Sequence, residues 1–248
     1  MNEIFLLNRA HWARATQQHF AVWERKERAI FLQMTPRVSL KGIESAGAYY
    51  RVARHFPVAE RRRLVSIINA VGTSEGSAEE RFDAFVRSVR KLANRFAQEF
   101  GNERRRLRPI SGMSKLLWYR FPFHGFIYDS QVLAAVCKNG LTVRFDGMMD
   151  AFGGRPSDDL EWNFMIAAAA YRTFVLTLHG PVAEVFKAYH LEPERAARLL
   201  DMLFWLDGDA DDPAHPTQRA TGSKIAGAIG EEAFARSEPI LVRLIKAT

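Results

Sequence analysis

Apolar residues recur three or four positions apart along most of the chain, which is the spacing of an amphipathic α-helix. The clearest case runs from Ala78 to Phe100. Ser77 stands directly before this segment as an N-cap, and Glu80 follows at the capping-box spacing, so the pattern also predicts where the helix begins. The apolar stripe of this helix consists of Phe82, Phe85, Val89, Leu92 and Phe96.

The same pattern predicts helices over most of the remaining chain. The expected ranges are 9–33, 43–56, 58–71, 113–120, 130–138, 143–152, 160–178, 181–189, 193–206 and 223–246. The segment 160–178 is apolar on almost every side, which is typical of a central buried helix. Gly, Pro and Ser clusters at 72–77 and 153–159 and an acidic stretch at 207–218 predict loops. No strand pair and no internal repeat stands out, so the predicted fold class is all-α.

Composition agrees with one globular unit over residues 1–248. Hydrophobic residues make up 48% of the chain and charged residues 25%, which is ordinary for a folded protein with a real core. No apolar run approaches the roughly 18 residues of a membrane span, and the N-terminus has no signal-peptide pattern. Cys137 is the single cysteine, so no intrachain disulfide can form. We therefore expect a cytoplasmic protein without a membrane partner.

Positive charge is concentrated in the first part of the chain. The net charge is +7, and residues 1–150 carry 25 Lys and Arg against 14 Asp and Glu, whereas residues 151–248 carry 10 against 14. Two triple-arginine runs, at 61–63 and 104–106, lie in the basic part. Such clusters attract polyanions and favour a nucleic-acid partner. The alternative is that each run is only the solvated face of a helix.

Several chemistries find no support in the sequence. It contains no phosphate-binding loop, dinucleotide fingerprint, HExxH motif or G-x-S-x-G elbow, and its seven histidines show no metal-ligand spacing. The acidic stretch 207–218 lacks the ligand spacing and the closing glutamate of a calcium loop. We expect neither a metal nor a cofactor.

Lys115 and Asp129 are candidates for chemistry. Lys115 follows a Ser-Gly pair and is expected in the first turn of the next helix, where the helix dipole and partial burial favour the neutral, nucleophilic amine. Asp129 precedes an apolar helix as a natural N-cap. The Pro/Gly loop between them lets the chain reverse, so the two side chains could converge. The alternative is a surface lysine and an aspartate that only caps.

The motif formed by "PISGMSK" at 109–115 and "FIYDSQV" at 126–132 resembles the helix-hairpin-helix DNA glycosylases, in particular the 8-oxoguanine DNA glycosylase branch. In that superfamily a hairpin ends in the lysine nucleophile, and the essential aspartate follows at a helix start. Lys115 and Asp129 fall on these two positions. The segment 108–132 is also similar to a bacterial family of unassigned role with this fold, sometimes found near antiviral defence genes. The resemblance implies two intimate helical lobes with a cleft between them.

The resemblance also implies a mechanism and a set of contacts. A base flipped out of duplex DNA would be removed by attack of Lys115 on the sugar, while Asp129 stabilises the cationic sugar. The base pocket candidates are Trp118, Tyr128 and Trp205. The expected phosphate contacts are Ser111, Gly112, Met113, Ser114, Arg104, Arg105 and Arg106.

Two other functions stay open, because the hairpin has a single glycine, Gly112, where the family usually has two. One is a glycosylase fold that acts on an unusual base or nucleotide in an antiviral defence pathway instead of base excision and DNA repair. The other is a non-catalytic module that binds DNA or another nucleic acid. The sequence leaves protein partners open.

Overall fold

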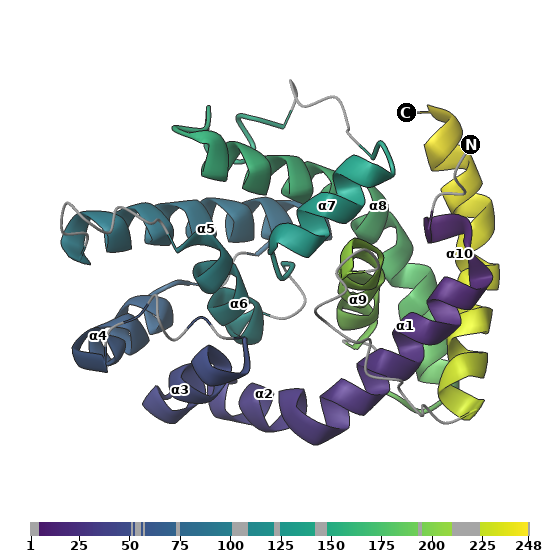
Figure 1. Cartoon of the computed structure of the whole chain (residues 1–248), viewed down its shortest axis with the longest axis horizontal. Coiled ribbons are helices and arrows are strands. Elements are labelled where there is room, and N and C mark those ends of the chain that lie inside the picture. The colour runs from purple at the N-terminus through teal and green to yellow at the C-terminus, as the bar shows by residue number, and fades with distance from the viewer. Residues whose placement is uncertain are drawn as a thin grey trace. The chain divides into compact units, whose positions relative to one another are not determined.

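The structure is a computed structural model that describes residues 5–50, 52, 56, 58–72, 75–100, 109–121, 125–141, 148–192, 195–209 and 224–247. Every regular element in these ranges is a helix (Figure 1). The all-α prediction is therefore confirmed for the described residues. None of the described helices is both long enough and apolar enough to span a membrane.

Tertiary contacts divide the chain into two compact units. Unit 1 comprises Met1–Arg25, Asp129–Arg144 and Ile166–Thr248, and unit 2 comprises Lys26–Tyr128 and Phe145–Met165. The chain passes from one unit to the other between Tyr128 and Asp129, and also inside a helix at Met165. Lys115 consequently belongs to unit 2 and Asp129 to unit 1, so each is described with its own unit.

Unit 1 is built on helices that pack lengthwise. The short η1 (Phe5–Leu7) and α1 (Arg9–Val22) pack against α10 (Lys224–Ala247), and α9 (Arg195–Asp209) packs against α1 and α7 (Ser130–Lys138) (Figure 1). Gly230 allows the close approach of α10 to α1, because a β-carbon there would lie 2.6 Å from the Trp12 carbonyl oxygen.

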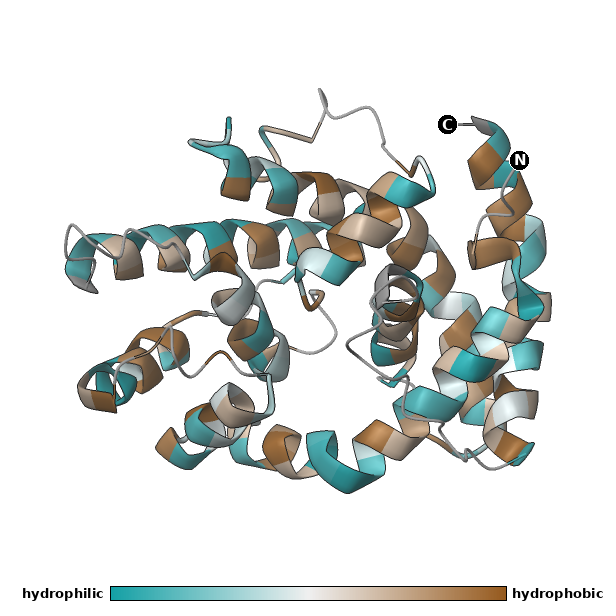
Figure 2. Cartoon of the chain, in the orientation of Figure 1, coloured by the Kyte–Doolittle hydropathy of each residue, from teal (hydrophilic) through white to brown (hydrophobic). Residues whose placement is uncertain are grey.

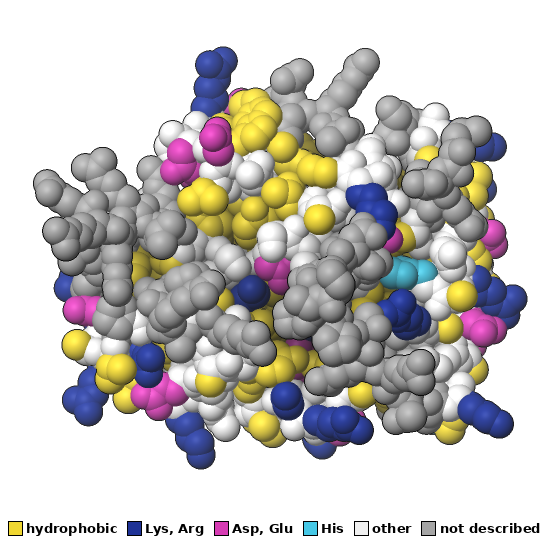
Figure 3. Space-filling view, in the orientation of Figure 1, with side chains coloured by type: hydrophobic (Ala, Val, Ile, Leu, Met, Phe, Trp, Pro, Cys, Tyr) yellow, Lys and Arg dark blue, Asp and Glu magenta, His cyan; other side chains and the backbone are white. Residues whose placement is uncertain are grey.

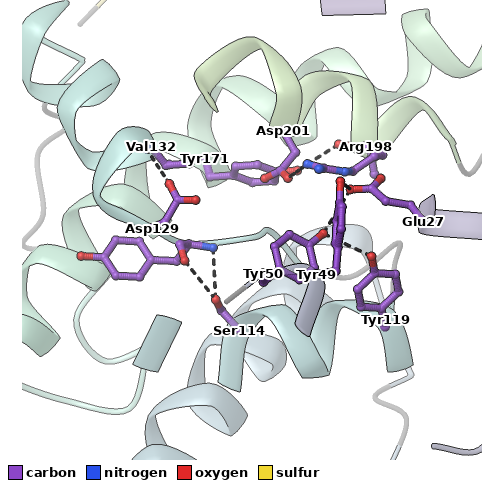
Figure 4. A network of polar contacts seen from close by, with 12 residues as sticks. Glu27, Tyr49, Tyr50, Ser114, Tyr119, Asp129, Val132, Tyr171, Arg198 and Asp201 are labelled. Atoms are coloured by element: carbon purple, nitrogen blue, oxygen red, sulfur yellow. Dashed lines mark hydrogen bonds and ion pairs between the residues drawn. The ribbon is translucent and has the colours of Figure 1, made fainter. Parts of the chain in front are cut away.

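A buried polar cluster ties α9 to α1 inside unit 1. Arg195 donates from Nε to Nε2 of His19 at 3.5 Å, and its guanidinium lies 4.4 Å from the Phe20 ring centroid. Burial, followed by the nearby arginines, lowers the pKa of His19 well below its ordinary value, so the ring is neutral. Arg198 pairs with Asp201 on the same helix (Figure 4). Arg195 and Arg198 are thus held inside unit 1 by partners on α1 and α9.

Unit 2 surrounds α6 (Ile110–Arg120) with other helices. α6 packs on α2 (Arg28–Met34), α3 (Leu40–Tyr49) and α5 (Ala78–Phe100), and α4 (Val58–Asn69) packs on α3. The first part of α8 (Asp159–Ala188) also belongs to this unit. In Figure 2, α5 carries both hydrophilic and hydrophobic residues along its length, which is the amphipathic pattern that predicts it.

The prediction for α5 is confirmed in both its bounds and its cap. The Ser77 amide donates to Oε2 of Glu80 at 2.7 Å, and the Glu80 amide donates to Oγ of Ser77 at 3.2 Å. Hydrogen bonds from the backbone amide and the side chain of Ser77 lower the pKa of the Glu80 carboxyl. The sequence pattern does not show that Arg90 is buried.

Arg90 holds the loop before α8 in place. Its Nε donates to Oε1 of Glu161 at 2.6 Å, and its other nitrogens donate to the carbonyls of Phe152, Gly154 and Arg155. Burial alone would raise the pKa of Glu161, but hydrogen bonds from Arg90 and Ser157 keep it below the ordinary value. Arg90, which is not part of the apolar stripe of α5, is thus a buried structural group.

Several predicted boundaries are wrong. α8 continues through Pro181 as one helix where the sequence predicts two, because Val182, Val185 and Phe186 beyond the proline are fully buried. Tertiary burial there outweighs the lost hydrogen bond of an internal proline.

Three other boundaries also differ from the prediction. α3 ends at Tyr49, and Met148–Gly153 forms turns where the end of a helix was expected. α6 begins at Ile110, three residues earlier than predicted.

Candidate functional site

The early start of α6 changes the setting of Lys115. The Met113 amide donates to the Pro109 carbonyl at 2.8 Å, so Ser111 and Gly112 already belong to the helix. Lys115 is the sixth residue of α6 and lies in its second turn. Since the effect of the helix dipole falls off within the first turn, it contributes less at this position than expected.

Lys115 is buried, with 6% of its surface exposed. Its Nζ donates to Oγ of Ser111, one turn earlier, at 3.1 Å, and lies 5.4 Å from the centroid of the Tyr50 ring. Lysine is almost never buried to this degree in soluble proteins without a specific partner or role. The interpretation of Lys115 as a surface lysine is therefore wrong.

Tyr50 belongs to a hydrogen-bonded network centred on Glu27 (Figure 4). Glu27 is fully buried, and its Oε1 accepts from the hydroxyls of Tyr49 at 3.3 Å and Tyr50 at 3.2 Å. The Tyr50 hydroxyl also lies 3.2 Å from that of Tyr119, which is one turn after Lys115 on α6. Because Tyr50 gives its one proton to Glu27, Tyr119 donates to Tyr50.

Sequence reasoning missed this network. Glu27 ends a π-helical turn, Trp23–Glu27, which connects α1 to α2. Such turns are frequent at functional sites, but nothing in the local sequence predicts one. Tyr49 and Tyr50 lie inside the predicted helix 43–56. The only local feature that could have pointed to the network is that two tyrosines are adjacent in the sequence.

Ser111 and Ser114 fasten the Tyr128 backbone to the start of α6. Ser111 Oγ donates to the Tyr128 carbonyl at 2.9 Å, and the Tyr128 amide donates to Oγ of Ser114 at 3.1 Å. Ser114 Oγ in turn donates to the Ser111 carbonyl at 2.9 Å. Both hydroxyls are therefore engaged within unit 2. The Met113 amide donates to the Pro109 carbonyl. That residues 111–114 contact a phosphate stays a prediction.

We expect Ser114→Ala to lower the free energy of unfolding by about 1–3 kcal/mol, because it removes the acceptor of the buried Tyr128 amide. Urea unfolding followed by circular dichroism measures this. Ser66→Ala is the matched control in the same unit, since Ser66 is exposed and makes only a 3.5 Å bond to Arg62. Equal stability of the two variants would show that the Tyr128 backbone is held by other contacts.

Asp129 caps α7, as predicted. Its Oδ1 accepts from the amides of Gln131 and Val132, both at 3.1 Å, and its backbone is extended. Asp129 follows Tyr128 directly, and the Tyr128 carbonyl accepts from Ser111, the same hydroxyl that binds Lys115. That the Lys115 and Asp129 side chains converge stays a prediction.

The proposed base-pocket residues differ in their surroundings. Trp118 is 1% exposed, and Tyr128 packs edge-on to the rings of Phe126 and Phe164, so both rings belong to the core of unit 2. Trp205 is partly exposed on α9 in unit 1. The surroundings of Trp118 and Tyr128 favour a structural role for these two rings.

The arginine runs are only partly described. Arg104, Arg105 and Arg106 lie outside the described residues, as does most of the acidic stretch 207–218. In the other run, Arg61 donates to the Phe56 carbonyl at 3.1 Å and Arg63 pairs with Glu99 at 2.9 Å. These two arginines therefore support unit 2 itself. On the face drawn in Figure 3, described Lys and Arg side chains appear at several separate points.

No known protein family, curated protein or solved structure matches the chain.

Proposed function

We propose that this protein is a DNA N-glycosylase with lyase activity that removes a modified purine through an imine on Lys115. The observation that carries the proposal is the buried Lys115 amine, which donates a hydrogen bond to Ser111 and lies over the Tyr50 ring. Burial disfavours the ammonium form of a lysine, and lysine nucleophiles are found in such desolvated settings. The proposal includes a glycosylase-like fold of two helical lobes with a cleft between them, in a cytoplasmic protein.

The bonds and protons of the first step are exchanged between the substrate and Lys115 alone. The amine lone pair forms a bond to C1′ of the sugar, and the bond from C1′ to the base breaks with its electrons going to the base. The proton lost by the attacking amine ends on the departing base. The C1′–O4′ bond then opens, O4′ takes a proton from water, and the Lys115 nitrogen becomes a protonated imine. Loss of a C2′ proton and departure of the 3′ phosphate cleave the strand.

Asp129 acts in this proposal as the carboxylate that stabilises positive charge on the sugar while the base departs. Its Oδ1 is occupied by two backbone amides of α7. The capping bonds hold the carboxylate in one orientation, so the structural and the catalytic roles are compatible.

The test is incubation with duplexes that each carry one damaged or modified base, in the presence of borohydride. We expect a covalent protein–DNA adduct with one or a few of these duplexes, and peptide mapping should place it on Lys115. If no duplex in a broad panel is trapped or loses its base, the proposal is wrong.

A second candidate is action on an unusual base or nucleotide outside ordinary repair, for example in antiviral defence. It is favoured by the use of Ser111 and Ser114 for internal bonds, which leaves fewer groups for the phosphate contact expected of the hairpin. Modified free nucleotides and single-stranded oligonucleotides in the same panel separate the two. A non-catalytic nucleic-acid-binding module is disfavoured by the buried amine of Lys115.

Phosphate contacts by the run Arg104–Arg106 predict a dependence of affinity on salt. Affinity for non-specific duplex should fall linearly on a log–log plot, with a slope of about −0.9 per phosphate neutralised. Replacing all three arginines by Ala should make the slope shallower by about one to three such units without changing preference among bases. Fluorescence titrations at several salt concentrations measure this, and an unchanged slope would place the run away from DNA.

A further inference from the structure

We propose that the Tyr50 ring stabilises the positive charge on the Lys115 nitrogen in the imine, and that Glu27 and Tyr119 are positioning residues that hold this ring. The inference rests on the proposed function, because it assigns a role within the same reaction. It concerns unit 2 alone, to which all four residues belong.

The geometry places the ring and not the hydroxyl against the lysine. Lys115 Nζ lies 5.4 Å from the Tyr50 ring centroid, within the range in which a cation is attracted by an aromatic face. The Tyr50 hydroxyl is engaged elsewhere, donating to Glu27 and accepting from Tyr119. Tyr119 lies on α6 and Glu27 in the π-helical turn, so the two hydrogen bonds hold the ring between two different elements.

The charge on the lysine nitrogen changes during the reaction. The attacking amine is neutral, whereas the protonated imine is cationic, so an aromatic face at this nitrogen stabilises the intermediate more than the reactant. A phenol that donates to a carboxylate carries more electron density on its ring than a free phenol. The bond to Glu27 therefore strengthens the effect of the Tyr50 ring.

Tyr49 provides a matched control. It precedes Tyr50, and its hydroxyl donates to the same Oε1 of Glu27, at 3.3 Å. Its ring, however, lies 5.8 Å from Nζ of Lys26. Replacing Tyr49 removes a comparable bond to Glu27 without removing the aromatic face beside Lys115.

The experiment measures imine formation on Lys115 without DNA. Full-length protein is incubated with glyceraldehyde and cyanoborohydride, and alkylation of Lys115 is quantified by mass spectrometry against Lys187, an exposed lysine of unit 1. We expect Tyr50→Leu to lower alkylation of Lys115 about tenfold and Tyr50→Phe about threefold. Glu27→Gln, which keeps an acceptor but removes its charge, should resemble Tyr50→Phe. Tyr49→Leu and Tyr49→Phe should stay within about twofold of the wild type.

Equal alkylation in the Tyr50 variants and their Tyr49 counterparts would overturn the inference, as would an unreactive Lys115 in the wild type. If circular dichroism shows that Tyr50→Leu does not fold, alkylation of Lys115 is compared between Tyr50→Phe and Tyr49→Phe, since Phe keeps the ring. The proposed function is tested separately by the duplex panel. A contrast between Tyr50 and Tyr49 without any trapped DNA would retain the inference about Tyr50 and refute the glycosylase activity.

Discussion

Lys115→Gln is expected to abolish both borohydride trapping and strand cleavage, a loss of at least about a thousandfold, because the only proposed nucleophile is removed. Gln is close in length to Lys and can still donate to Ser111, which now accepts from Nζ at 3.1 Å. The fold and the affinity for duplex should therefore change little. Single-turnover assays with the duplex identified by the panel measure the loss, and salt titrations measure the affinity.

Lys91→Gln is the matched control for this experiment. Lys91 is exposed on α5 in the same unit, so its replacement removes the same charge without touching the site. It should trap DNA as the wild type does. Full trapping by Lys115→Gln would show that another amine forms the adduct.

Asp129→Asn is expected to slow base release about a hundredfold to a thousandfold, because a neutral amide stabilises a cationic sugar far less than a carboxylate does. Asn is about as good an N-cap as Asp, and its carbonyl oxygen can accept the amides of Gln131 and Val132. The free energy of unfolding should therefore stay within a few tenths of a kcal/mol of the wild type. Asp129→Ala, which loses the cap, should cost about 1 kcal/mol.

Single-turnover base release and urea unfolding on the same preparations separate the two roles of Asp129. Asp158→Asn is the control, since Asp158 also accepts a backbone amide, that of Glu161 at 2.9 Å, at the start of α8. It should leave base release unchanged. An Asn variant at 129 that releases the base at the wild-type rate would reduce Asp129 to a cap.

Where local interactions decide a feature, the sequence predicts it correctly. The bounds of α5 and α7 follow from apolar periodicity and from caps at Ser77 and Asp129 that bond residues two or three positions away. The start of α6 is different. Pro109 makes no side-chain cap bond, and Ser111 and Ser114 instead bond to Tyr128, which is distant in sequence. Ser111 and Gly112 belong to the helix, whereas the local pattern predicts its start at Met113.

The sequence by itself determined that the described part of the chain is helical and that Asp129 caps a helix, since periodicity and capping are local properties. Only the tertiary structure decided that Lys115, Arg90 and Glu27 are buried. Burial of a charge depends on partners far along the chain, such as Tyr50 for Lys115 and Glu161 for Arg90. A charged residue is removed from water only when such partners compensate the lost hydration, and no local pattern reveals whether they do.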